Sequence, residues 1–117
     1  MNRLVLTPDG WRNWTLVEDF KEEVEVPEKG LVEIIVPKGF RTDLASVPRP
    51  FWSIIPPMGR YSQAAVIHDY LCTNRQFPSN VTHKIFYDLM LKYDTYPRKA
   101  KLMYTAVKWF GPKWELP

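Results

Sequence analysis

The sequence predicts an α+β fold: an N-terminal antiparallel β-meander of three to four strands, then a proline-rich loop, then three helices packed on one face. Three observations carry this prediction. Strand-like patterns come first and helical periodicity follows, an order typical of α+β domains. The early connections are turns too short for the crossovers that parallel strands need. The 117 residues, 45% hydrophobic and 25% charged, suffice for one core. We therefore expect a single domain over 1–117.

Turn residues divide the predicted β-region, 1–43, into short strands. The segment Thr7–Gly10 reads as a turn, because its proline presets φ and its glycine accepts a positive φ. Valines alternate with glutamates in 23–26, and Leu31–Val36 gives the strongest strand pattern. The continuous apolar run Ile34–Val36 predicts burial on both faces of the sheet. Because the helices are expected on only one face, we expect another chain to cover part of the other.

The remaining chain is predicted to form a Pro/aromatic loop over 44–60 and helices over 61–117. Apolar residues at helical spacing predict a first helix over 61–71. Ser79 is placed to cap the second helix, and Pro97 lies in the first turn of the third. Gly111 and the proline after it are expected to end the third helix.

Composition narrows the classes of function. The net charge is +3, with acids gathered early and bases late, which suits acidic polymers or an acidic neighbouring subunit. No run of Lys or Arg interleaves with aromatics on one face, which argues against a nucleic-acid partner. A single cysteine excludes an internal disulfide. No apolar stretch approaches the roughly 20 residues of a membrane span, and the N-terminus lacks the features of a signal peptide, so we expect synthesis in a host cytoplasm and no membrane partner.

Candidate catalytic residues concentrate in 40–72. They are Asp43, Ser46, His68 and Asp69. A serine, a histidine and an aspartate have the composition of a triad, but the glycine-flanked elbow that exposes a serine nucleophile is absent. The local alternative is that the polar side chains of the turn bond backbone N–H groups and hold it.

A metal site is a second possibility at the same place. Asp43, His68 and His83 could supply three N/O ligands from a turn and two helices, as a catalytic zinc requires. Nothing in their spacing demands it, so the sequence predicts no metal and no other cofactor. The alternative is a buried His68, held by Asp43 or by a backbone carbonyl, that fixes the loop to the first helix. Cys72 near a helix C-terminus is poorly placed for a thiolate nucleophile.

Aromatic residues make up 15% of the chain, and aromatics dominate both cores and interfaces. The C-terminal segment holds three candidates for contact with a partner, namely Trp109, Phe110 and Trp114. The alternative is that they pack back on the sheet.

Three blocks in order resemble one family: TDLASVPRPFW (42–52), GRYSQAAVIHDYLC (59–72) and KLMYTAVKWFGPKW (101–114). This pattern is similar to the phage- and prophage-encoded domain-of-unknown-function family 1353. The resemblance implies a bacteriophage origin but supplies no activity. Relatives tend to carry an acid near the position of His83, so a histidine there departs from the pattern. The family's positions in this chain are Asp43, Ser46, Pro48, Gly59, Tyr61, His68, Asp69 and Tyr70.

The favoured function on these grounds is a virion-associated structural protein of the tail or baseplate, with other phage structural proteins or further copies of itself as partners. We expect it in the virion after synthesis in the host. Two alternatives stay open. One is a small hydrolase, directed at the cell envelope or peptidoglycan, that uses Asp43 and His68, oriented by Asp69 or His83. The other is a host-takeover or anti-defence binding protein.

Overall fold

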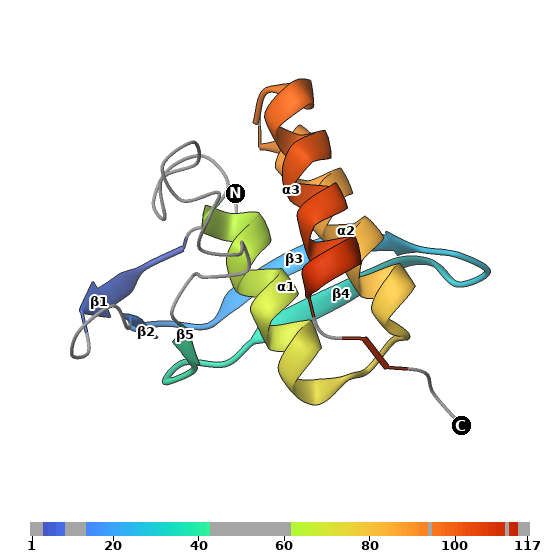
Figure 1. Ribbon diagram of the computed structural model, residues 1–117. Coiled ribbons are helices and arrows are strands. Elements are labelled where there is room, and N and C mark those ends of the chain that lie inside the picture. The colour runs from blue at the N-terminus through green and yellow to red at the C-terminus, as the bar shows by residue number, and fades with distance from the viewer. Residues whose placement is uncertain (1–3, 9–13, 43–61, 94, 112, 115–117) are drawn as a thin grey trace.

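The computed structural model describes residues 4–8, 14–42, 62–93, 95–111 and 113–114. Within them the chain forms antiparallel strands in two sheets followed by three helices (Figure 1). The predicted α+β class is confirmed. The strands number five in the described residues, where the sequence predicted three to four in one meander.

The strands form two sheets, because β3 and β4 pair only with each other. The first sheet has the order β1 (Leu6–Pro8), β2 (Trp14–Leu16), β5 (Arg41–Thr42), and all its pairs are antiparallel. The second is a hairpin of β3 (Phe20–Val26) and β4 (Gly30–Val36). Backbone hydrogen bonds join Leu16 at the end of β2 to Gly39 and Phe40 just before β5. The β3–β4 hairpin is the part of the chain between these two neighbouring strands.

One face of the hairpin is buried and the other is exposed. On β3, Phe20, Glu22, Val24 and Val26 are buried and the residues between them are exposed. On β4, Ile34 and Val36 are buried, whereas Ile35 is 43% exposed. The prediction of burial on both faces was therefore wrong for these residues: the apolar run Ile34–Val36 alternates inward and outward as a pleated strand dictates.

Two of the three helices cover the inner face of the hairpin, and the third packs on one of these two. The helices are α1 (Ser62–Asn74), α2 (Ser79–Lys92) and α3 (Pro97–Phe110), close to their predicted ranges. The helix α2 contacts both β3 and α3, and α1 contacts α2, β4 and β5. In Figure 1 the hairpin passes behind α1 and α2, and α3 lies in front of α2. The result is three layers, with α2 between the hairpin and α3.

The first residue of α2 does not act as its cap. The N-cap position is Pro78, with no side-chain cap bond, and the Ser79 hydroxyl donates to the Trp114 carbonyl at 3.0 Å. The predicted Ser79 cap was wrong because a distant backbone segment takes up that hydroxyl.

The end of α3 depends on a close approach at Gly111. Its φ is −81°, an ordinary value, so no left-handed conformation is involved. A Cβ there would lie 2.5 Å from the carbonyl oxygen of Val107, far inside van der Waals contact. Glycine is required at this position for space.

A charged residue lies on the buried face of β3. Glu22 is 1% exposed, and its Oε1 accepts a bond from Lys92 Nζ at 2.6 Å. Its other oxygen accepts a bond from the Tyr93 hydroxyl. These contacts tie the end of α2 to the hairpin, so the carboxylate is buried with its partners supplied.

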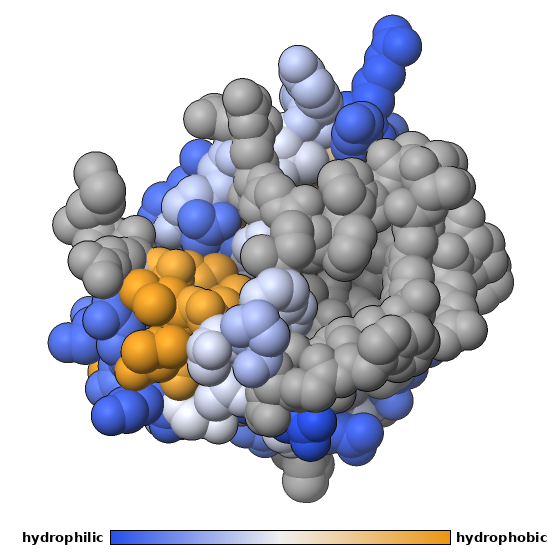
Figure 2. Space-filling view, turned by 90° about the vertical axis from the view of Figure 1, so that its left-hand side faces the viewer, coloured by the Kyte–Doolittle hydropathy of each residue, from blue (hydrophilic) through white to orange (hydrophobic). Residues whose placement is uncertain are grey.

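The side of the molecule that carries β1 and β2 shows an apolar patch beside hydrophilic surface (Figure 2). Val17, which follows β2, is 45% exposed, and its N–H donates to the carbonyl of Val5. Among the helices described, none is both long and apolar enough to cross a membrane.

Candidate functional site

The structure brings together two of the predicted site residues, His68 and His83. His68 lies on α1 and His83 on α2, and each is only 2% exposed. Their ring nitrogens Nε2 of His68 and Nδ1 of His83 are 2.8 Å apart, a hydrogen-bond distance. Asp43 and Ser46 lie outside the described residues, as do the family positions Pro48, Gly59 and Tyr61.

Aromatic side chains surround the histidine pair. Phe86, one turn after His83 on α2, stacks on the His68 ring with centroids 4.6 Å apart and planes 26° apart. Trp114 lies against the His83 ring edge-on, with centroids 6.2 Å apart. The sequence prediction missed that Phe86 accompanies the histidines, although His83, Phe86 and Met90 are three buried residues at the helical spacing i, i+3 and i+7.

Trp114 is held in place by the start of α2. Its indole N–H donates to the Phe77 carbonyl at 2.7 Å. Its backbone N–H donates to the Ser79 hydroxyl at 3.1 Å, and that hydroxyl donates back to its carbonyl. The guanidinium of Arg75 lies over the indole, 5.2 Å from the ring centroid. The chain after α3 therefore returns to cover His83.

The environment keeps His68 neutral. Burial and, to a smaller extent, the proximity of His83 together lower the pKa of His68 from its ordinary 6.5 to about 3. A neutral His68 can share one hydrogen bond with His83, in which one nitrogen donates and the other accepts. A proton added to His68 would place a charge in this apolar surrounding, at a cost that its pKa reflects.

The neighbouring thiol is neutral as well. Cys72 Sγ lies 3.6 Å from Nε2 of His68, one helical turn along α1. The pKa of Cys72 is raised to about 12, mainly by burial and also by the Asp69 carboxylate, while Arg75 acts in the opposite direction. A thiol with this pKa carries almost no thiolate at neutral pH, which is the nucleophilic form.

Asp69 faces away from the histidine pair. Its Oδ2 accepts a bond from the Thr42 hydroxyl at 2.6 Å, which joins α1 to β5. Adjacent helical side chains point about 100° apart, so His68 turns to α2 while Asp69 turns to the first sheet. The His–Asp dipeptide therefore contributes to two separate contacts.

The described residues contain no group of three or more His, Cys, Asp or Glu side chains arranged to hold a metal ion. His68 and His83 are a possible ligand pair by composition, but the nitrogens that face each other share a hydrogen bond. The third predicted ligand, Asp43, lies outside the described residues.

The predicted interface residues differ in exposure. Trp109 is 67% exposed on α3. Trp114 is half-buried and packs within its own chain, as the contacts above show. The side chain of Phe110 lies outside what the structure describes.

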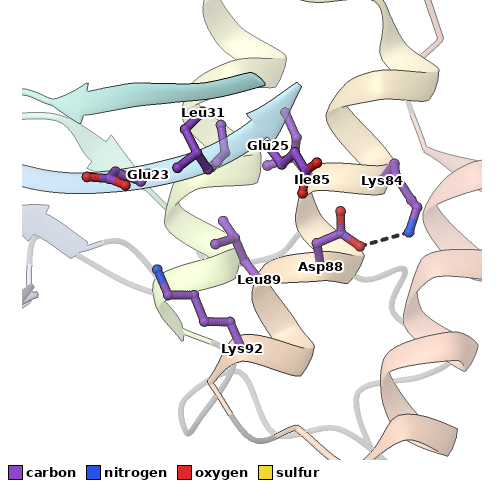
Figure 3. A pocket seen from close by; sticks show the side chains of 9 residues that line it. Glu23, Glu25, Leu31, Lys84, Ile85, Asp88, Leu89 and Lys92 are labelled. Atoms are coloured by element: carbon purple, nitrogen blue, oxygen red, sulfur yellow. Dashed lines mark hydrogen bonds and ion pairs between the residues drawn. The ribbon is translucent and has the colours of Figure 1, made fainter. Parts of the chain in front are cut away.

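A hollow of the surface lies between the hairpin and α2, and neither histidine lines it (Figure 3). Its volume is about 500 Å³. Lys84 and Asp88 pair across one turn of α2 at 2.8 Å, and that hydrogen bond raises the pKa of Lys84. The groove offers paired charges and apolar side chains, but no histidine or cysteine. Its lining is Glu23, Val24, Glu25, Leu31, Lys84, Ile85, Asp88, Leu89 and Lys92.

The model of the family described as "Protein of unknown function (DUF1353)" matches residues 14–107. The chain belongs to this family. The matched region runs from β2 to the last turns of α3, and so contains the histidine pair and all of the hairpin. No solved structure matches the chain significantly.

Two curated relatives of the DUF1353 domain come from Sinorhizobium fredii (strain NBRC 101917 / NGR234). The uncharacterized protein y4jT is 47% identical over 83 residues, which are 69% of this chain and 25% of the relative. The uncharacterized protein y4iH is 42% identical over 80 residues, which are 66% of this chain and 33% of the relative. The chain thus spans a quarter to a third of the length of these relatives.

Proposed function

We propose that this DUF1353 domain acts by binding other proteins, as a structural component of the tail or baseplate of a virion, and without a catalytic step of its own. The observation that carries the proposal is that His68 is buried, hydrogen-bonded to His83 and hard to protonate. A general base must reach the proton that it takes and needs a pKa near the working pH. His68 is 2% exposed, hydrogen-bonded to His83, and has a pKa of about 3.

The exposed aromatic side chains among the described residues support a binding role. Trp109 and Tyr96 are 67% and 68% exposed at the two ends of α3. Large exposed aromatics are costly in water and are enriched at protein interfaces. The relatives support the same view, because the matching region is only a part of each longer protein, as expected of a module joined to others. The virion assignment depends on the expectation, stated from the sequence motifs, that members of this family are encoded by phages and prophages.

Mass spectrometry of purified phage particles tests the proposal directly. We expect peptides of this chain at a fixed ratio to the tail proteins, retained after a high-salt wash. Particles that lack the chain would contradict the virion assignment. If the protein then bound a protein of uninfected host cells, the host-directed alternative would take its place.

An activity assay separates the binding role from the hydrolase. Purified protein is incubated with peptidoglycan, and the released soluble fragments are measured for the wild type and for His68→Gln. We expect no release from either protein. Release by the wild type that His68→Gln abolishes, with the variant still folded by circular dichroism, would replace the binding role with the hydrolase.

A further inference from the structure

The outward face of α3 is basic and partly apolar, and it has no partner among the described residues. Ala100, Met103 and Val107 are buried on the opposite face, toward α2. The helix contains four cations and no acid. None of these cations forms an ion pair in the part of the chain that the structure describes. This basic face consists of Arg98, Lys99, Lys101, Leu102, Lys108 and Trp109.

The outer face of the hairpin has the opposite charge. Glu23 and Glu33 are directly opposite each other in the β3–β4 register, and like charges in that position destabilise a strand pair. Two bases of α2 that line the groove beside Glu23 and Glu25 are already paired, Lys84 with Asp88 and Lys92 with Glu22. Leu31 is 71% exposed on the same face. This acidic face consists of Glu23, Glu25, Leu31, Glu33 and Ile35, with Lys21 at its end.

The two faces point away from each other within one molecule. The hairpin turns its inner side to α1 and α2, and α3 packs on the far side of α2 (Figure 1). They can meet only between molecules. Their lengths agree: a 14-residue helix is roughly 21 Å long, and a seven-residue strand is roughly 23 Å long. Each face also carries two or more large exposed apolar side chains.

We propose that the basic face of α3 docks on the acidic face of the hairpin in a second copy of this chain. The proposal deepens the structural role given above and rests on it. Because the two surfaces differ and lie on opposite sides, the contact is head-to-tail, and each copy keeps one free face of each kind. Such a contact repeats until a ring closes or a filament grows. Many copies of a protein with such a contact can form a ring or a layer within a larger assembly.

A charge-reversal pair tests the contact. The first variant, Lys101→Glu with Lys108→Glu, gives an acidic helix beside an acidic hairpin. The second, Glu23→Lys with Glu33→Lys, gives a basic hairpin beside a basic helix. All four side chains are exposed, so neither change disturbs the core. The control is Lys38→Glu, an exposed cation in the turn after β4 that belongs to neither face.

Sedimentation at concentrations from 1 to about 200 μM, in low salt and in about 0.5 M salt, gives the readout, because exposed charge pairs are screened by salt. We expect the wild type and Lys38→Glu to assemble at low salt and to dissociate at high salt. Each reversed variant alone should associate at least about tenfold more weakly. An equimolar mixture should assemble again, because each variant then offers the face that the other has lost.

Three results would overturn the proposal. One is a wild type that stays monomeric over the whole range. Another is a reversed mixture that does not recover assembly. The third is a monomeric chain that binds a labelled oligonucleotide through α3, lost in Lys101→Glu with Lys108→Glu, which would assign the basic face to an anionic polymer. If the head-to-tail contact is refuted but the protein is still found in phage particles, the virion role is unaffected. Self-assembly without any particle association refutes that role and leaves this contact intact.

Discussion

The buried histidine pair predicts that acid weakens the fold before the ordinary carboxylates are protonated. In the unfolded chain His68 titrates near 6.5, and in the folded chain at about 3. Between these values the unfolded state binds a proton that the folded state does not, so the free energy of unfolding falls as the pH falls. The stabilising contribution is fully present above pH 6.5. Below that value the free energy of unfolding decreases by about 1.4 kcal/mol for each pH unit.

The magnitude at pH 5 follows from the same two values. The 1.5 units between the unfolded pKa and pH 5 correspond to about 2 kcal/mol lost relative to pH 7.5. Urea unfolding followed by tryptophan fluorescence at both pH values measures this loss. The comparison is with His68→Gln, whose amide can still bond His83 but carries no titrating group.

We expect the wild type to lose about 2 kcal/mol more than His68→Gln between pH 7.5 and pH 5. Lys38→Gln, at an exposed position, is the matched control and should keep the wild-type pH dependence. Equal losses in the wild type and in His68→Gln would refute the reasoning, since they would mean that His68 takes up its proton in the folded state.

Three further predictions concern packing, a buried charge and metal. Gly111→Ala should destabilise the fold by about 1–3 kcal/mol, because its Cβ would meet the Val107 carbonyl; an unchanged melting temperature would show that the chain after α3 can move aside without cost. Glu22→Ala should lower the free energy of unfolding by about 1–3 kcal/mol, because it removes the acceptor of the Tyr93 hydroxyl. Glu23→Ala on the exposed face should change that free energy by less than about 0.5 kcal/mol. Similar losses of stability in both variants would contradict the role of Glu22. Elemental analysis of protein purified without chelator should find no zinc, and one zinc per chain would promote the hydrolase.

The fold class and the helix positions could be predicted from the sequence because their signals are local. Periodic apolar residues and Pro97 place α3 over its observed range. Alternating valines and glutamates likewise place β3. The division into two sheets was missed, since it depends on the pairing of β2 with β5, whose partner residues are 26 and 28 positions apart in the chain.

The sequence by itself determined where the three helices and the β3–β4 hairpin lie, and it marked His68, Asp69 and His83 as chemically unusual. Its turn at Thr7–Gly10 was wrong in part, because Thr7 and Pro8 pair with β2 as strand β1. Only the tertiary structure decided that His68 and His83 share a hydrogen bond, that Asp69 turns to Thr42, and that both histidines are buried. The same holds for Trp114, which bonds Ser79 across 35 positions, and for Glu22, which bonds Lys92 across 70. Local patterns fix the direction of each side chain on its own element, but the packing of one element on another fixes which side chains meet.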